Sequence, residues 1–179
     1  MNKYKNNFAY IDGSNLYQGI KSSNWKINFY RFRKWLSDKY GIKRAYYFIG
    51  LMPKEKDLYA SLQKAGFTLI FKEVVYDGDG KPKGNCDADL VLQSAIDFFE
   101  NNCDRQVLVT SDGDYACLAK ILKSNNRLTA ILSPYQTDKC SILLKRINAP
   151  IVYLNDVKEK IRLNEKAPSK DGTLKGSFS

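Results

Sequence analysis

Aspartates follow two apolar runs of the sequence, in positions suited to binding a cation. Asp112 and Asp114 come after the run Val107–Val109, and Asp12 directly follows the run Phe8–Ile11. Such runs are typical of buried parallel strands, whose carboxyl ends border the crevice where open α/β sheets bind ligands. A helix N-cap would explain one acid at each strand end, but it would not explain the pair. We therefore expect acids from two strands to share one crevice.

A further acid comes from the start of a predicted helix, residues 87–101. On helical spacing Asp87 shares a face with Val91, whereas Asp89 points away from it. We assign Asp87 to the site and interpret Asp89 as a first-turn acid that favours the helix dipole, with a role as a substitute ligand left open. Carboxylates this close repel one another unless Mg²⁺ or Mn²⁺ neutralises them, and oxygen ligands suit these hard ions. The predicted metal ligands and catalytic residues are Asp12, Asp87, Asp112 and Asp114.

Polar residues next to these acids are predicted to contact the substrate. Asn15 lies one helical turn beyond Asp12, so its amide is placed to orient a metal ligand or a phosphate. Thr110 and Ser111 supply hydroxyls just before the second strand-end acid. Lys83 belongs to a turn-rich segment, residues 76–86, and either reaches the substrate or points into water.

The chain has no histidine and four widely spaced cysteines. The absence of histidine excludes Ser-His-Asp and Cys-His catalysis and removes the commonest general base. Water activated by a divalent ion is the expected nucleophile, because such an ion lowers the pKa of water to about 7. The cysteines form no Cys-x-x-Cys pair, so we expect free thiols in a reducing cytoplasm, with Cys117 and Cys140 packed in the core.

The formal net charge is +10, from 29 basic and 19 acidic residues. A basic surface around an acidic pocket suits a metal-dependent enzyme that acts on a polyanion, although lysines also simply solvate a surface. No apolar stretch reaches the roughly 20 residues of a membrane span, and no leader is evident, so we expect a soluble cytoplasmic protein. The sequence leaves the oligomeric state open, including a homo-oligomer.

Short apolar runs alternate with helical periodicity along the chain, which predicts an α/β fold with a mainly parallel sheet between helical layers. We expect one domain over residues 1–163 and a polar, mobile tail over 164–179. The predicted strands span residues 8–11, 45–49, 67–75, 106–110, 127–132 and 151–153. The predicted helices span residues 29–39, 55–65, 87–101, 115–124, 140–147 and 156–163, the last capped by Asn155.

Several short motifs, taken in order, resemble the NYN domain (the LabA or DUF88 group) of the PIN-like nuclease superfamily. They are YIDGSNL at 10–16, KGNCD at 83–87, VTSDGDY at 109–115, CSILL at 140–144 and YLND at 153–156. The resemblance implies a Rossmann-like PIN fold, a metal site at the four aspartates, and cleavage of RNA. Thr110–Ser111 and Asn85–Cys86 depart from the usual pattern but remove no carboxylate.

The preferred hypothesis is thus a Mg²⁺- or Mn²⁺-dependent ribonuclease, an endonuclease acting on single-stranded RNA. Two alternatives remain open. One is a non-catalytic RNA- or DNA-binding regulatory module on the same fold. The other interprets Asp112 and Asp114 as the D-x-D motif of a nucleotide-sugar transferase, or as part of a phosphatase, but does not account for Asp12 and Asn15.

Overall fold

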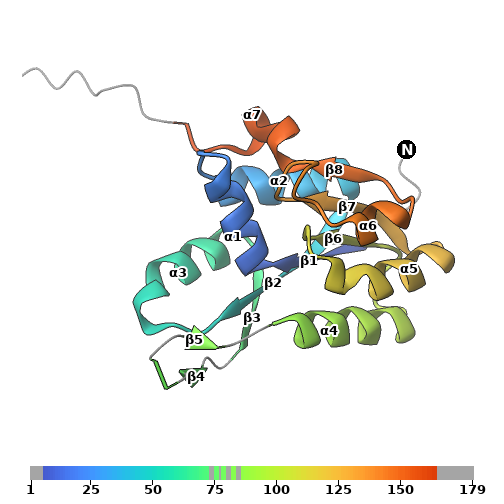
Figure 1. Ribbon diagram of the computed structural model, residues 1–179, viewed down its shortest axis with the longest axis horizontal. Helices are drawn as coiled ribbons and strands as arrows, with labels where there is room; N and C mark the ends of the chain where they lie inside the picture. Colours follow the sequence, from blue (N-terminus) through green and yellow to red (C-terminus); the bar gives the residue numbers. More distant parts are fainter. Residues whose placement is uncertain (1–5, 73–74, 77, 80–81, 84–85, 165–179) are drawn as a thin grey trace, which may run out of the picture.

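A computed structural model of the chain describes residues 6–72, 75–76, 78–79, 82–83 and 86–164. It contains a six-stranded parallel sheet with the order β3-β2-β1-β6-β7-β8 (Figure 1). The strands are β1 (Asn7–Asp12), β2 (Ile42–Gly50), β3 (Thr68–Lys72), β6 (Gln106–Val109), β7 (Leu128–Ser133) and β8 (Ile151–Tyr153). A separate antiparallel pair consists of β4 (Val75–Tyr76) and β5 (Pro82–Lys83).

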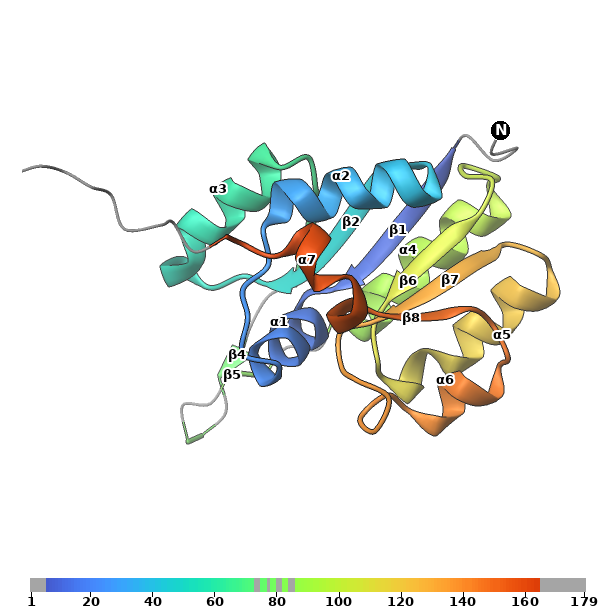
Figure 2. The ribbon, with the colours of Figure 1, turned by 90° about the horizontal axis from the view of Figure 1, so that it is seen from above.

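Helices cover both faces of the sheet (Figure 2). On one face lie α1 (Gly13–Ser22), α2 (Phe29–Tyr40), α3 (Lys56–Lys64) and α7 (Lys158–Ile161). On the other lie α4 (Asp87–Phe99), α5 (Ala116–Ser124) and α6 (Ile142–Arg146). Short 3-10 helices complete the chain: η1 (Pro53–Glu55), η2 (Gly113–Tyr115) and η3 (Leu154–Val157). The predicted α/β/α architecture is confirmed.

The two cores follow from the alternation of side chains along each strand. In β1, Ala9 and Ile11 pack beneath α1 and α2, whereas Phe8 and Tyr10 pack beneath α4 and α5. Successive residues of a strand point to opposite faces, so a strand covered on both faces is mostly apolar. All residues of β1 and β6 are buried accordingly.

The strand order reverses direction between β1 and β6. Taken in chain order, the six strands of the sheet have the order 3-2-1-4-5-6, and the first and fourth lie side by side. In such sheets the crevice beyond the carboxyl ends of these two strands is the usual place for a ligand. Asp12 ends β1 and Asp112 follows β6, so both acids lie at this point.

Some local expectations were wrong. A helical turn was expected after Asp12, but no range was predicted for helix α1, whose two glycines lower helix propensity; Leu16 and Ile20 are buried at helical spacing. The C-terminal segment begins as η3, and α7 has no side-chain cap, so Asn155 does not cap it. Cys117 is exposed on the outer face of α5, whereas Cys140 is buried as predicted.

Other predicted features fall only partly on the described residues. The predicted strand at 67–75 ends at Lys72, and β4 and β5 pair within the predicted loop at 76–86. The predicted tail lies outside the described residues, apart from Asn164. Its side-chain oxygen accepts a hydrogen bond from Arg31. Within the described part of the chain, no helix is long and apolar enough to cross a membrane.

Candidate active site

Asp12 lies at the turn from β1 into α1 and is only 7% exposed. Its Oδ1 accepts a hydrogen bond from the Asn15 backbone N–H at 3.0 Å, which makes it the N-cap of α1. The next residue, Gly13, packs so closely on β2 that a Cβ there would lie 2.5 Å from the Phe48 carbonyl oxygen. The glycine therefore brings the helix start, and with it the carboxylate, against the end of the sheet.

Tyr115 joins this carboxylate to a second one. Its hydroxyl donates to Asp87 in a short hydrogen bond and lies 3.3 Å from Asp12 Oδ2. The tyrosine comes from η2 and the second acid from the first residue of α4, so three elements meet at one phenolic oxygen. A hydroxyl has one proton, so it cannot donate fully to both acids at once. The Tyr115 hydroxyl thus lies between two carboxylates and can donate fully to only one of them.

Burial and mutual repulsion change how readily these groups ionise. Burial is the main cause that raises the pKa of Asp12, and the nearby charges of Asp87 and Asp112 add to it. The hydrogen bonds from Asn15 and Tyr115 oppose the rise. Burial also raises the pKa of Tyr115 far above its ordinary value, and the two carboxylates raise it further. The phenol is therefore a permanent neutral donor near neutral pH.

Asp112 occupies the matching position at the end of β6. It is half-buried, and its Oδ1 accepts from the backbone N–H of Asp114 at 3.0 Å, which caps η2. Its own backbone N–H donates to Thr110 Oγ1 at 3.1 Å. Asp114 itself is exposed. Asp112 therefore faces Asp12 closely enough to affect its ionisation, whereas Asp114 lies on the open side of the turn.

Asn15 connects the two strand ends. Its side-chain Oδ1 accepts from the Ser111 backbone N–H at 2.8 Å, a contact between residues 96 positions apart. This fixes the amide plane, so the Asn15 Nδ2 donors point away from the Ser111 backbone. The Ser111 hydroxyl is buried and contacts Ser133 Oγ at 2.8 Å and the Tyr135 N–H at 3.1 Å. It holds the β6 and β7 ends together.

The other predicted residues lie apart from this group. Asp89 forms an ion pair with Lys72 of β3 at 3.1 Å. Lys83 is in β5, and its side chain lies outside the described residues. Tyr115 was missed as a functional residue. The hydroxyl of this tyrosine, at the end of the VTSDGDY motif, was the available signal.

The chemistry of the donor set fits a hard divalent ion. Asp12 and Asp87 approach one hydroxyl, and the side-chain atoms that would bind a metal are all oxygens. In the described chain, no lysine or arginine forms an ion pair with Asp12. In the described residues no three acidic, cysteine or histidine side chains lie close enough together to form a ready-made metal site. The close group is thus the Asp12–Asp87 pair, with Asp112 next to it.

Comparisons with known proteins agree with this architecture. A protein of unknown function from Vibrio parahaemolyticus RIMD 2210633 has a crystal structure that superposes with a TM-score of 0.72. The two sequences are 20% identical, and the match covers 91% of this chain and 99% of that one, which shows a shared fold. A search of curated proteins finds no match.

A parallel sheet of this order between helical layers is consistent with the Rossmann-type fold of the PIN-like nuclease superfamily, to which the NYN domain belongs. The sequence matches the NYN domain over residues 9–148, well over half of its length. The chain therefore belongs to the NYN domain family, as the sequence motifs predicted.

Proposed function

We propose that this NYN domain is a Mg²⁺- or Mn²⁺-dependent ribonuclease that hydrolyses single-stranded RNA internally. The observation that supports the proposal most directly is the pair Asp12 and Asp87. Asp12 comes from the end of β1 and Asp87 from the start of α4, and both approach the Tyr115 hydroxyl. A buried acid with a raised pKa beside two other acids is costly to ionise without a cation. Such a cost is retained at functional sites more often than elsewhere.

Asp12, Asp87 and Asp112 would hold the ion, with Asp114 at the open edge of the group. A bound divalent ion would supply charge neutralisation at the phosphate and a lowered pKa for water. Tyr115 would hold Asp12 and Asp87 in place by hydrogen bonding. Its pKa is raised, so the phenol keeps the proton that it donates. These carboxylates would accept the proton that the attacking water releases.

Asn15 is the best placed residue to orient the phosphate. Its oxygen is fixed by Ser111, so its Nδ2 group is oriented to donate to a phosphate oxygen. Thr110 is buried and positions the loop by accepting from the Asp112 N–H, so its contribution to substrate binding would be indirect. For Ser111 a structural contribution is favoured, since its hydroxyl already bonds to Ser133 and Tyr135. Lys83 would contact the RNA backbone from β5.

Replacement of Asp112 by asparagine tests the proposal. The change keeps the cap of η2, because asparagine also caps, but removes one charge from the group. We expect cleavage of a mixed RNA pool in Mg²⁺ or Mn²⁺ to fall about 100-fold or more, since even indirect partners of a metal site cost 10–100-fold. RNA binding should be retained. Asp57→Asn, a change at an exposed acid of α3, is the matched control and should cleave normally.

Unchanged cleavage by the Asp112 variant would overturn the assignment. Absence of divalent-dependent cleavage by the wild type, with RNA binding intact, would instead support a non-catalytic RNA-binding module. That alternative is favoured by one observation, the lack of a three-acid group in the described residues. The free state of all four cysteines supports a cytoplasmic location. Sedimentation of the purified protein would determine whether it forms a homo-oligomer.

A further inference from the structure

The outer surface of α1 has an aromatic ring and a cation side by side. Tyr17 is 57% exposed, and the Lys21 ammonium lies 5.6 Å from the centre of its ring. These residues belong to a stripe of exposed side chains spaced at helical intervals, made up of Ser14, Tyr17, Gln18 and Lys21. An exposed ring next to a cation is the combination that single-stranded nucleic acids use, with a base on the ring and a phosphate on the cation.

This stripe starts at the candidate active site. The N-cap of α1 is Asp12, and five residues at 1.5 Å each place Tyr17 about 8 Å further along the helix axis. A strand lying in the crevice would therefore reach Tyr17 within one or two nucleotides. Asn15 lies between them, with its oxygen fixed toward Ser111.

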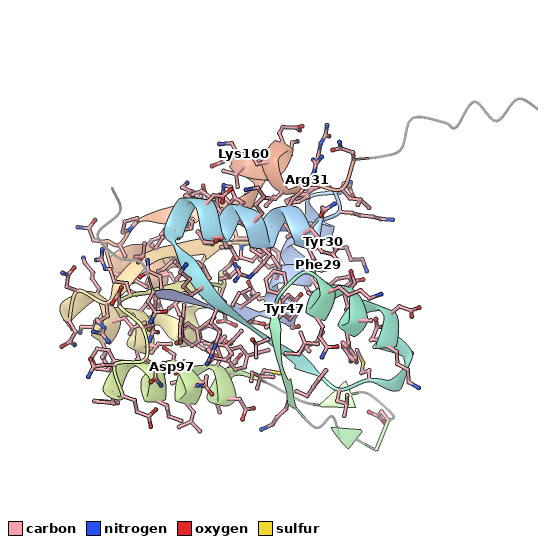
Figure 3. All side chains as sticks on the ribbon, turned by 180° about the vertical axis from the view of Figure 1, so that it is seen from behind. Phe29, Tyr30, Arg31, Tyr47, Asp97 and Lys160 are labelled. Carbon is pink, nitrogen blue, oxygen red and sulfur yellow. The ribbon has the colours of Figure 1, made fainter. Side chains whose placement is uncertain are left out.

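A second basic feature lies on the same side of the molecule. A groove of about 240 Å³ between α2 and α7 is lined by Arg31, Lys34, Trp35, Asp38 and Lys160. Lys34 is paired with Asp38 at 2.7 Å, whereas Arg31 bonds to the neutral Asn164. Figure 3 shows Arg31 and Lys160 next to each other at the outer surface of α2 and α7. Among the described residues, no acidic side chain forms an ion pair with Arg31 or Lys160.

Backbone hydrogen bonds make α1, α2 and α7 one continuous surface. The segment between α1 and α2 pairs with the end of α7, since Asn28 N–H donates to Ile161 at 2.8 Å and Leu163 N–H to Lys26 at 2.7 Å. The three helices lie next to one another in both Figure 1 and Figure 2. We call the exposed surface formed by Tyr17, Lys21, Arg31 and Lys160 the basic face.

The opposite side of the molecule has a different character. The outer stripe of α4 consists of Leu92, Ile96 and Phe99, which are 60%, 38% and 77% exposed. The helix has no lysine or arginine. A polyanion would gain no charge neutralisation there. The outer surface of α4 therefore has exposed apolar side chains but lacks the cations that α1, α2 and α7 expose.

We propose that the basic face binds the part of a single-stranded RNA that flanks the cleaved bond, with a base stacked on Tyr17 and phosphates at Lys21 and in the groove at Arg31 and Lys160. This inference rests on the proposed function for the identity of the substrate. It adds a binding track outside the carboxylate group, and it assigns α1 to both chemistry and substrate alignment.

The charge contribution is tested by salt-dependent binding of a labelled single-stranded RNA of mixed sequence in the presence of a chelator. Without divalent ions the measurement does not depend on cleavage. The double variant Lys21→Ala/Lys160→Ala should lower the slope of log K against log salt by about 1.4, since each phosphate contact on a single strand contributes about 0.7. The control variant, Lys64→Ala/Lys120→Ala, removes the same charge from exposed positions on α3 and α5 and should leave the slope unchanged.

The stacking contribution is tested at Tyr17. Tyr17→Ala should weaken binding of the same RNA roughly tenfold, and Tyr17→Phe should restore it, because the ring rather than the hydroxyl provides the stacking surface. Phe99→Ala removes a still more exposed ring from α4 and should not change binding.

Equal effects of the two double variants, together with full binding by Tyr17→Ala, would overturn the basic face while the carboxylate site remained intact. If Asp112→Asn lost cleavage while Lys21→Ala/Lys160→Ala bound and cleaved RNA like the wild type, the carboxylate site would stand and the basic face would be rejected. Loss of RNA binding in the Tyr17 and lysine variants alone, in the absence of any cleavage by the wild type, would support the face and reject the nuclease.

Discussion

Two buried tyrosine hydroxyls in this domain bind aspartates, but the balance of donors and acids differs between the two places. Tyr10 donates to Asp97 at 2.7 Å, and the same carboxylate also accepts from the Gln93 and Asn102 side chains at 3.2 and 3.0 Å. Near the candidate active site the single hydroxyl of Tyr115 lies between two acids. In the first case three side-chain donors converge on one acid, whereas in the second one hydroxyl lies between two acids.

The difference separates a structural carboxylate from candidate functional ones. Asp97, on the α4 side of the sheet in Figure 3, is 1% exposed and surrounded by donors that satisfy its oxygens. Asp12 is nearly as buried but lies beside other acids, which adds to the rise in its pKa. Positive charge is what would balance such a group, so the comparison favours a cation at Asp12 and none at Asp97.

The largest expected effect comes from removing the structural acid. Asp97→Ala leaves the Tyr10, Gln93 and Asn102 donors without their acceptor in a buried place, so the free energy of unfolding should fall by about 3 kcal/mol or more. Asp112→Ala removes a half-buried cap and should cost only about 1 kcal/mol. Urea denaturation followed by tryptophan fluorescence measures both. Similar losses in the two variants would erase the proposed distinction.

A smaller and more specific effect is expected at the two hydroxyls. Tyr115→Phe and Tyr10→Phe each remove one donor to a carboxylate, so each should lower the free energy of unfolding by about 2 kcal/mol. Only Tyr115→Phe should also reduce RNA cleavage, by roughly tenfold, because Asp87 loses the group that positions it. Comparable activity losses in both variants would indicate a general stability effect and contradict a positioning role for Tyr115.

Much of the site was predictable because its signals are local. The apolar runs before Asp12 and Asp112 identify buried parallel strands, and helical spacing alone separates Asp87 from Asp89. The rule that ligands bind beyond the carboxyl ends of parallel strands then brings the strand-end acids together. The strand order completes the inference, since β1 and β6 are neighbours.

The contacts that hold the site together were not predictable, because they depend on tertiary packing. Tyr115 reaches Asp12 across 103 residues, and Asn15 reaches Ser111 across 96. No local pattern specifies which rotamer a buried phenol adopts between two helices. The same limit applies to Asp114, which the motif groups with the other acids although it is exposed on the outer side of η2.

The smallest and most telling effect is expected from Asp12→Asn, which should stabilise the protein while removing its activity. Asparagine still caps α1, and its amide can donate to the Tyr115 oxygen. The variant no longer has a charge that burial and two neighbouring acids disfavour. In a chelator at neutral pH the free energy of unfolding should rise by roughly 1 kcal/mol, the usual size of such gains at active sites.

The sign of its pH dependence follows from the raised pKa of Asp12. The folded state holds this proton more tightly than the unfolded state, whose carboxyl has the ordinary pKa of 3.8. The contribution of the Asp12 proton to wild-type stability is therefore lost as the pH rises from about that value through the folded pKa. Above the folded pKa this loss is complete. The advantage of Asp12→Asn should be full above the folded pKa of Asp12 and vanish below about pH 3.8, where both side chains are neutral. An advantage that stays constant across this range would show that charge at Asp12 is not what destabilises the site, and the argument for a cation there would fail with it.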